Sequence, residues 1–436
     1  MMCCNKFVGR VLALALVTLL AACGGGGGGG GESATAPVEV PGTPTLNSLP
    51  SIAPGMKSNE LQIYVDAGPA NTGYNVNRLY TDVTICLPGK SSPGSPTQCQ
   101  TIDHVLVDTG STGLRLLSSV MAPALRLPRQ TSTGDLPLLN CAQFVDDTSA
   151  WGPVVTADVV LGGKTAAGLP IQVIGDPAFN HLTSASPSPC SGAPMTTAKE
   201  LGANGILGVG LLKEDCGVRC INLVNNNSYY TCSDAGCTAP VGARASTAQQ
   251  VKNPVTKFAA DNNGILIDLR AAIASGEPSL SGSIIFGIGT QANNQLESAT
   301  RAVLTTNSSG YITTRLEGQS LSRSFIDSGS NGLFFNSTMT PCGAGGEGFY
   351  CPDSRTTLTA TLVATNGATR AISFSVDKAT DLFAGGRNHV LPTLAGDILG
   401  HPSTFDWGLP FFYGRRVFFG IEGMASSLGT GPFYAF

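Results

Sequence analysis

The feature of this 436-residue chain that most restricts its fold is a short motif that occurs twice. The first copy, VDTGSTGL, occupies residues 107–114, and the second, IDSGSNGL, occupies residues 326–333. Asp, Gly, Ser, Gly and Leu recur at the same offsets, and an apolar segment precedes each copy. One copy alone is weak evidence, because Asp and Gly both favour turns. Two copies in the same context predict two related halves, each with an acidic loop at the end of a buried strand.

The chemistry of the two motifs favours paired use of Asp108 and Asp327. A carboxylate at the end of a buried strand is costly unless it is hydrogen-bonded. The glycine two positions later allows a tight turn that brings backbone N–H groups to the carboxylate. If the two loops meet, the carboxyl groups share one proton, because like charges at close range cannot both ionise. One aspartate can then act as general base on a water while the other, protonated, polarises a carbonyl group.

The remaining sequence predicts a β-rich, turn-rich protein. Glycine is frequent, with 55 residues, and many segments are rich in Val, Ile, Thr and Ser. A chain of this length can form two lobes. Asn366-Gly367 between two alternating segments predicts a β-hairpin, and residues 257–276 are the best candidate for a helix. Strands are further expected at residues 61–68, 78–89, 101–111, 154–164, 169–176, 282–290 and, as two short strands, 409–423.

The motifs and their surroundings resemble the pepsin-like, bilobal aspartic peptidases over most of residues 60–423. Residues 150–163 resemble the hairpin called the flap, and residues 204–210 resemble the hydrophobic-hydrophobic-Gly element of the first lobe. Residues 281–289 and 406–423 resemble strands of the second half. The resemblance implies an all-β fold of two lobes related by a pseudo-twofold axis. We expect these lobes at residues 59–275 and 276–436.

The resemblance also implies a role for individual residues. Asp108 and Asp327 form the catalytic dyad, and their loops are braced through the hydroxyl groups of Thr109 and Ser328. The expected supporting residues are Gly110, Ser111, Gly329 and Ser330, the two serines donating to the outer carboxylate oxygens; the expected flap residues are Trp151 and Gly152. The family usually has Tyr where Trp151 stands, which changes the donor from O–H to N–H.

The second hydrophobic-hydrophobic-Gly element is ambiguous in the sequence. Gly408 has the better spacing, but Asp406-Trp407 precedes it. Ile398-Leu399-Gly400 fits the pattern but lies early. Both assignments stay open at this level.

The function implied is that of an aspartic endopeptidase acting on a peptide or protein without metal or cofactor. The alternative is a protein of the same fold that is catalytically inactive and acts as a binding or inhibitor module. The four histidines lack a metal-binding spacing, and His104 is expected to be a structural residue. No Gly-x-Ser-x-Gly motif of a serine hydrolase is present. The chain has no basic block and a formal charge of −4, which gives no indication of a nucleic-acid partner.

The N-terminal region predicts export. Lys6 and Arg10 precede an apolar run, residues 11–20, which is too short to span a bilayer but suits a signal peptide. Leu20-Ala21-Ala22-Cys23 resembles a bacterial lipobox, which implies a signal peptide at residues 1–22 and acylation of Cys23. Residues 23–58, with eight consecutive glycines, are expected to form a flexible tether. Residue 24 is Gly rather than Asp, which in such lipoproteins implies anchoring in outer-membrane lipids, on the periplasmic or the surface face. The protein is also expected to be a monomer. The alternative is an ordinary signal peptide in which Cys23 is incidental.

The cysteines also indicate export. Ten follow Cys23, at positions 86, 99, 141, 190, 216, 220, 232, 237, 342 and 351. An even number in an exported chain predicts disulfides, and Cys86 with Cys99 and Cys342 with Cys351 are close enough to join hairpins. The group at residues 216–237 also has a zinc-like spacing, but disulfides are the preferred interpretation.

Overall fold

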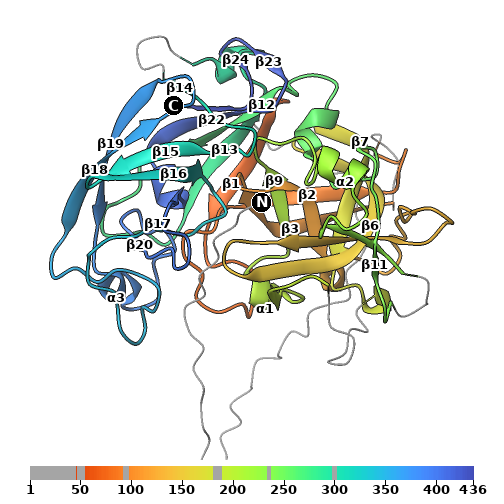
Figure 1. The fold of residues 1–436 in the computed structure, drawn as a ribbon, viewed down its shortest axis with the longest axis horizontal. Helices are drawn as coiled ribbons and strands as arrows, with labels where there is room; N and C mark the ends of the chain where they lie inside the picture. The colour runs from red at the N-terminus through yellow and green to blue at the C-terminus, as the bar shows by residue number, and fades with distance from the viewer. Residues whose placement is uncertain (1–45, 47–54, 92–97, 180–188, 233–236, 297–301) are drawn as a thin grey trace, which may run out of the picture.

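A computed structural model of the protein describes residue 46 and residues 55–91, 98–179, 189–232, 237–296 and 302–436. Figure 1 shows two lobes built from strands, the earlier one in orange to green and the later one mainly in blue. The predicted signal peptide, Cys23 and nearly all of the predicted tether lie outside the described residues, so these expectations stay predictions.

The first lobe is a set of strands with two short helices. Its core is aliphatic, from Ile63 and Val107 to Leu207, and these side chains are fully buried. Its elements are β1 (Glu60–Val65), β2 (Tyr80–Cys86), β3 (Cys99–Asp108), β4 (Thr112–Leu117), β5 (Leu138–Gln143), β6 (Thr148–Leu161), β7 (Lys164–Ile174), β8 (Ala193–Pro194), α1 (Ala198–Leu201), β9 (Gly205–Val209), α2 (Val218–Asn222), β10 (Tyr229–Thr231) and β11 (Val241–Gly242).

A central group of strands joins the two lobes. β1 pairs antiparallel with β13, and β13 continues through β12, β22 and β25 to β14. These strands are β12 (Gly264–Leu269), β13 (Leu280–Phe286), β14 (Val303–Thr305), β22 (Arg415–Gly420) and β25 (Phe433–Ala435). The boundary expected between residues 275 and 276 falls in the loop between β12 and β13, which pair with each other. The exact division of the lobes therefore stays a prediction.

The second lobe contains its own sheet, in the order β19-β18-β15-β16-β21-β17-β20. Aromatic side chains fill it, and Phe405 stacks on both Phe335 and Trp407. Its elements are β15 (Ile312–Leu316), β16 (Gln319–Ile326), β17 (Leu333–Phe335), β18 (Thr356–Val363), β19 (Thr369–Val376), α3 (Ala379–Phe383), β20 (Ala395–Gly396) and β21 (Phe405–Trp407), with the small hairpin β23 (Ala425–Ser426) and β24 (Gly429–Thr430) near the C-terminus.

The two lobes repeat one arrangement around the acidic loops. β3 runs parallel to β9 and places Asp108 opposite Gly208, while β4 pairs antiparallel with β9. In the second lobe β16 runs parallel to β21, which β17 joins antiparallel. The α-helices of the described part have only four or five residues. The predicted all-β, two-lobed, pepsin-like fold is therefore confirmed.

No helix in the described part of the chain is both long and apolar enough to cross a membrane.

The other predicted strands overlap observed ones, but the predicted helix was wrong and one of the two short strands near the C-terminus is absent. Residues 264–269 form β12 instead of a helix, because Ile265 to Ile267 are buried between β13 and β22; a short apolar run does not separate the two possibilities. Of the two short strands expected at residues 409–423, the second is present as β22; in place of the first, Leu409–Phe411 is a 3-10 turn, in which Pro410 has no N–H to offer a strand partner. The hairpin is confirmed, because β18 and β19 pair up to Val363 and Thr369 around Asn366-Gly367.

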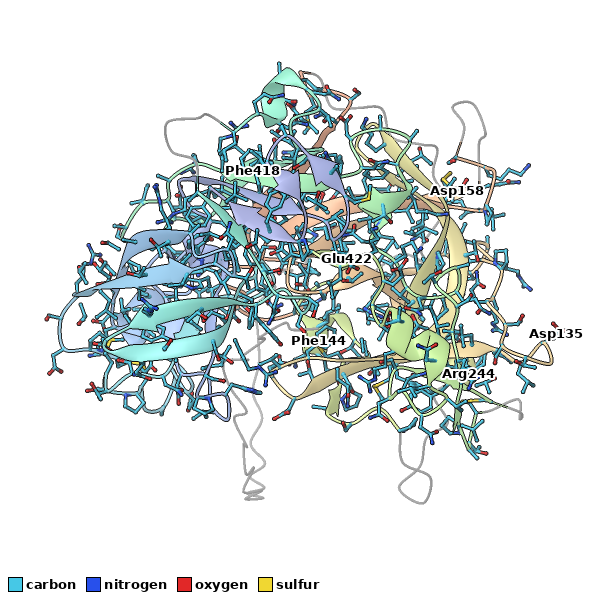
Figure 2. All side chains as sticks on the ribbon, turned by 45° about the horizontal axis from the view of Figure 1, so that its top comes forward. Asp135, Phe144, Asp158, Arg244, Phe418 and Glu422 are labelled. Carbon is cyan, nitrogen blue, oxygen red and sulfur yellow. A yellow bond between two sulfur atoms is a disulfide. The ribbon has the colours of Figure 1, made fainter. Side chains whose placement is uncertain are left out.

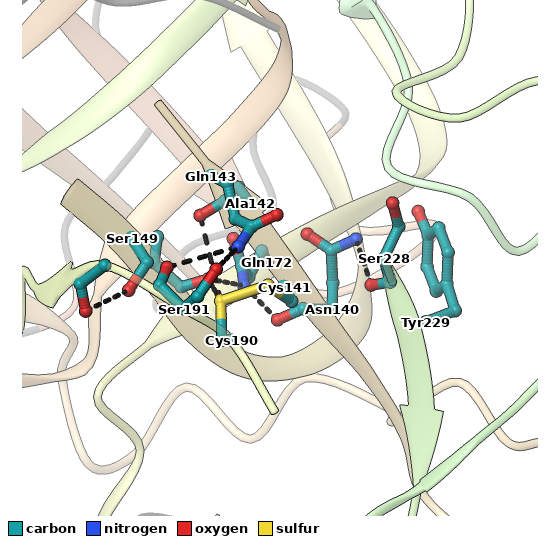
Figure 3. Close-up of a disulfide and its surroundings, with 12 residues drawn as sticks. Asn140, Cys141, Ala142, Gln143, Ser149, Gln172, Cys190, Ser191, Ser228 and Tyr229 are labelled. Atoms are coloured by element: carbon teal, nitrogen blue, oxygen red, sulfur yellow. Dashed lines mark hydrogen bonds between the residues drawn. A yellow bond between two sulfur atoms is a disulfide. The ribbon is translucent and has the colours of Figure 1, made fainter. Parts of the chain in front are cut away.

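All ten cysteines after Cys23 form disulfides. The expected pairs Cys86–Cys99 and Cys342–Cys351 are present, and Cys216–Cys220 and Cys232–Cys237 exclude the zinc alternative. The fifth pair, Cys141–Cys190, fixes a connecting segment against β5 and is drawn in Figure 3. Such links stabilise a fold chiefly by restricting the unfolded chain.

His104 on β3 predicts a pH dependence of stability. Its Nδ1 lies 2.6 Å from Asp103 and its Nε2 lies 3.4 Å from Asp66. Burial acts to lower the pKa of His104, but hydrogen bonds and charge from the two carboxylates outweigh it and raise the pKa to about 9. Because the folded pKa is raised, this stabilisation is complete below the ordinary value of 6.5 and is lost as the pH rises through about 9.

We therefore expect His104→Asn to lower the free energy of unfolding by about 1–2 kcal/mol near pH 6, and by much less near pH 10. Asn is chosen because it tolerates the positive φ of 48° at this position. Urea unfolding at the two pH values measures the difference. An equal loss at both would show that the charge of His104 is unimportant.

Candidate active site

The two acidic loops meet between the lobes. Asp108 is the last residue of β3, and Asp327 directly follows β16. The backbone N–H of Asp327 donates to the carbonyl oxygen of Trp407 on the neighbouring strand, over 3.0 Å. Both aspartate side chains are fully buried. The fold thus brings together the two carboxyl groups that the sequence singled out.

Backbone and hydroxyl donors surround the two carboxyl groups. The N–H of Gly110 lies 2.8 Å from Oδ1 of Asp108 and 3.0 Å from Oδ1 of Asp327, so one donor bridges the pair. Gly329 donates to Oδ1 of Asp327 over 2.7 Å. The hydroxyl group of Ser111 donates to Oδ2 of Asp108. These are the backbone and side-chain donors expected from the sequence, now with their geometry.

The carboxyl groups of Asp108 and Asp327 lie close enough to interact, since both accept the N–H of Gly110. Burial raises the pKa of Asp327 well above its usual range, and the neighbouring carboxyl group of Asp108 raises it further. Two carboxyl groups in such contact titrate as a pair. The pair is therefore built to hold a proton where isolated aspartates would be ionised.

Thr109 and Ser328 connect the loops in a reciprocal way. The hydroxyl oxygen of Thr109 accepts from the N–H of Ser328 over 2.9 Å and donates to the carbonyl oxygen of Ile326 over 3.3 Å. The hydroxyl oxygen of Ser328 accepts from the N–H of Thr109 over 3.2 Å and donates to the carbonyl oxygen of Val107 over 2.8 Å. Each lobe thus holds the loop of the other, which fixes the distance between the carboxyl groups.

The structure decides between Gly400 and Gly408. Gly408 lies against the second acidic loop, where an added Cβ atom would come within 2.1 Å of the carbonyl oxygen of Gly332 and 2.7 Å of that of Ser330. Gly208 is equally tight against the first loop, with Thr112 at 2.6 Å. A Cβ atom on Gly400 would meet nothing within 4 Å. Gly408 is therefore the counterpart of Gly208.

This contrast gives a matched pair of variants. Gly408→Ala is expected to destabilise the protein by about 3 kcal/mol or more, because backbone atoms must move apart. Gly400→Ala is expected to cost only about 1 kcal/mol, from its positive φ of 81°. Thermal unfolding followed by circular dichroism measures both. Similar losses in the two variants would contradict the assignment of Gly408.

Trp151 and Gly152 lie in β6, in a hairpin with β5. The indole N–H of Trp151 donates to the carbonyl oxygen of Phe179 over 3.0 Å, and its ring packs edge-on against Tyr230. A Cβ atom on Gly152 would lie 1.8 Å from the carbonyl oxygen of Val173, so this position is tightly packed within the first lobe. The donor of Trp151 is thus used inside the lobe, and a flap role for these residues stays a prediction.

The sequence interpretation missed two buried polar groups near the loops. Asp406, on β21, accepts a hydrogen bond of 2.6 Å from the hydroxyl group of Ser330. Arg115, on β4, is fully buried and pairs with Asp215 at 3.2 Å. The only sequence signal for Asp406 was its position in a pattern that calls for a hydrophobic residue.

The Arg115–Asp215 pair belongs to a network that ties β4 to its neighbours. Arg115 donates to the side-chain oxygens of Asn140 and Gln172, each over 2.6 Å. Asn140 and Tyr229 in turn donate to Asp215. Figure 3 shows Gln172 and Asn140 next to the Cys141–Cys190 disulfide, with Tyr229 farther from it, beyond Ser228. The strand that follows the first acidic loop is therefore fixed by hydrogen bonds as well as by packing.

A pocket opens beside the first acidic loop. It holds about 520 Å³ of empty space, including its open mouth. Both lobes line it, through residues 109–112, 210–212 and 215 of the first and 309–311, 325 and 434 of the second. Glu422, labelled near the middle of Figure 2, accepts from the N–H of Lys213 and so holds one wall in place. Gly110 and Ser111 thus connect the dyad to an accessible space.

Comparison with known proteins identifies the family but no activity. The family model described as "Protein of unknown function (DUF3443)" matches residues 55–436, and the chain belongs to this family. No curated protein matches the chain. Among solved structures, the aspartic proteinase from Irpex lacteus is similar at 15% identity and a TM-score of 0.42, over 86% of this chain and 96% of that chain. The function is therefore inferred from the geometry of the site.

Proposed function

We propose that this protein is an aspartic endopeptidase, in which Asp108 and Asp327 activate a water for attack on a peptide bond. One observation carries the proposal: two buried aspartates from separate loops share the N–H of Gly110 as a donor. A buried pair of this kind is unfavourable for stability alone, because two carboxyl groups must be desolvated together. Two carboxyl groups in contact, with the pKa of one raised, as it is for Asp327, are characteristic of acid–base sites.

In the proposed reaction the pair begins with one shared proton. The ionised carboxylate takes a proton from the water as its oxygen attacks the carbonyl carbon, and the protonated carboxyl donates to the carbonyl oxygen. The tetrahedral intermediate then collapses as the amide nitrogen accepts a proton and leaves. No covalent bond to the enzyme forms, and no metal or cofactor is needed. The Thr109–Ser328 brace holds the carboxyl groups at the distance that this exchange requires.

The pocket beside Gly110 suits a side chain of the substrate. Leu211, Tyr311 and Phe325 contribute apolar walls, while the backbone of residues 109–112 offers polar groups. Ligand sites combine these features. We propose that a peptide enters between the lobes at this point and reaches the dyad past Gly110.

We also propose that the protein works in the bacterial cell envelope, attached to outer-membrane lipids through Cys23. Five disulfides fit an oxidising compartment.

A second candidate is a catalytically inactive binding or inhibitor module on the same fold. The observation that favours it is the complete burial of the side chains of Asp108 and Asp327. A binding module has no need for solvent at the dyad. A peptidase must admit water and a peptide bond there.

Incubation of the purified mature protein with a denatured protein mixture, from about pH 3 to pH 7, separates the two candidates. Pepstatin, which occupies aspartic dyads, serves as the inhibitor control. New peptides that disappear with pepstatin support the peptidase. Intact substrate at every pH, together with retained binding of peptides, supports the binding module.

A further inference from the structure

Asp406 places a third carboxyl group near the dyad, linked to Asp327 through the hydroxyl group of Ser330. It lies on β21, one strand away from Asp327, and is fully buried. The titratable groups that interact electrostatically with Asp406 are Asp108, Asp327 and, on β25, Tyr434. Asp406 forms no ion pair within the described residues. A buried carboxylate without a cation is costly, so Asp406 has a physical reason to stay neutral.

The hydrogen bonds of Ser330 give a second, independent reason. Its hydroxyl oxygen lies 3.0 Å from Oδ2 of Asp327 and 2.6 Å from Oδ2 of Asp406. A serine hydroxyl has one proton, so it can donate to only one of these oxygens and must accept from the other. One of the two carboxyl groups must therefore carry a proton on Oδ2.

The surroundings of Asp406 decide which carboxyl group this is. Oδ1 of Asp406 is buried and has no hydrogen-bond partner among the described residues. Asp327 has the N–H groups of Gly110 and Gly329 as donors to its Oδ1. An ionised carboxylate needs such donors, whereas the carbonyl oxygen of a neutral acid tolerates their absence better. The proton therefore belongs on Asp406.

We propose that Asp406 is a neutral positioning residue, which donates to Ser330 so that Ser330 donates to Asp327, and that the three carboxyl groups together hold two protons. The catalytic meaning of this arrangement rests on the proposed peptidase function. A neutral Asp406 adds no charge beside the dyad and aims the Ser330 proton at Asp327. Both effects favour ionisation of one carboxyl group of the dyad, so the dyad can reach the state with a single shared proton at lower pH.

The test compares the pH dependence of unfolding in the parent protein and in Asp406→Asn. An acid that stays neutral in the folded state and ionises in the unfolded state makes stability fall as the pH rises. Between about pH 5 and pH 7, the ratio of the parent's unfolding constant to that of Asp406→Asn should rise about tenfold per pH unit. Asp406→Leu, which removes the same proton, should show the same slope. Asp381→Asn, at an exposed carboxyl group, is the matched control and should run parallel to the parent.

Parallel slopes for the parent and both Asp406 variants would overturn the proposal. So would failure of both variants to fold, because a neutral Asp406 predicts that neutral replacements are accepted. The test distinguishes failure of this proposal from failure of the proposed peptidase function. If the parent cleaves no peptide but the slopes differ, the proton assignment stands and the peptidase fails. If the parent is active and the slopes are parallel, only the role of Asp406 fails.

Discussion

Replacing Asp108 or Asp327 by asparagine is expected to reduce kcat/KM for peptide cleavage by about 10³-fold or more. Asparagine keeps the shape of the side chain but neither accepts the proton of the water nor supplies an acidic proton to the carbonyl oxygen. Because both carboxyl groups act in the same step, the double variant should lose little more activity than either single variant. The measurement is the initial rate of cleavage at the pH optimum of the parent.

Two controls show that such a loss concerns chemistry and not folding. Asp381→Asn should keep full activity, because this carboxyl group is exposed on the second lobe. Asp327→Asn should be at least as stable as the parent at neutral pH. Because the pKa of Asp327 is raised in the folded protein, its carboxyl group lowers the free energy of unfolding once the pH exceeds the pKa that it has in the unfolded chain. Asparagine does not titrate and removes this loss. Full proteolysis by either asparagine variant would disprove the proposed mechanism.

The brace between the loops predicts the second large effect. Thr109→Val and Ser328→Ala should each lower the free energy of unfolding by about 2–3 kcal/mol, because each leaves a buried N–H and a buried carbonyl without its partner. The double variant should lose less than the sum, since the two hydroxyl groups act within one network. Activity should fall together with stability, because the distance between the carboxyl groups is no longer fixed.

A matched pair of hydroxyl groups provides the control for the brace. Thr357 on β18 and Ser375 on β19 also form a hydrogen bond between hydroxyl groups, over 3.0 Å, but at an exposed site. Thr357→Val and Ser375→Ala should change stability by less than about 0.5 kcal/mol. Denaturant unfolding compares the four single variants directly. A similar small effect at Thr109 and Ser328 would show that the lobes do not depend on the brace.

Features that depend on local chemistry could be predicted from the order of the residues. The repeated motif identified Asp108 and Asp327, because a turn of Asp, Gly and Ser after an apolar strand has the same local needs in both halves. Asn366-Gly367 predicted its hairpin, and the short spacing between Cys86 and Cys99 predicted their disulfide. In each case, neighbouring residues in the chain contain the whole reason for the structure.

Other features depend on partners far away in the chain, and these could be seen only in the folded structure. Residues 264–269 form β12 because β13 and β22 pair with both of its edges. Gly408 rather than Gly400 lies where a Cβ atom cannot fit, because the backbone of the second acidic loop occupies that space. Asp406 looked like a departure from a hydrophobic pattern, and it gained a role only when β21 came to lie beside Ser330 and Asp327. Burial and the supply of hydrogen-bond donors set the protonation of a carboxyl group, and both come from segments that the linear sequence does not place together.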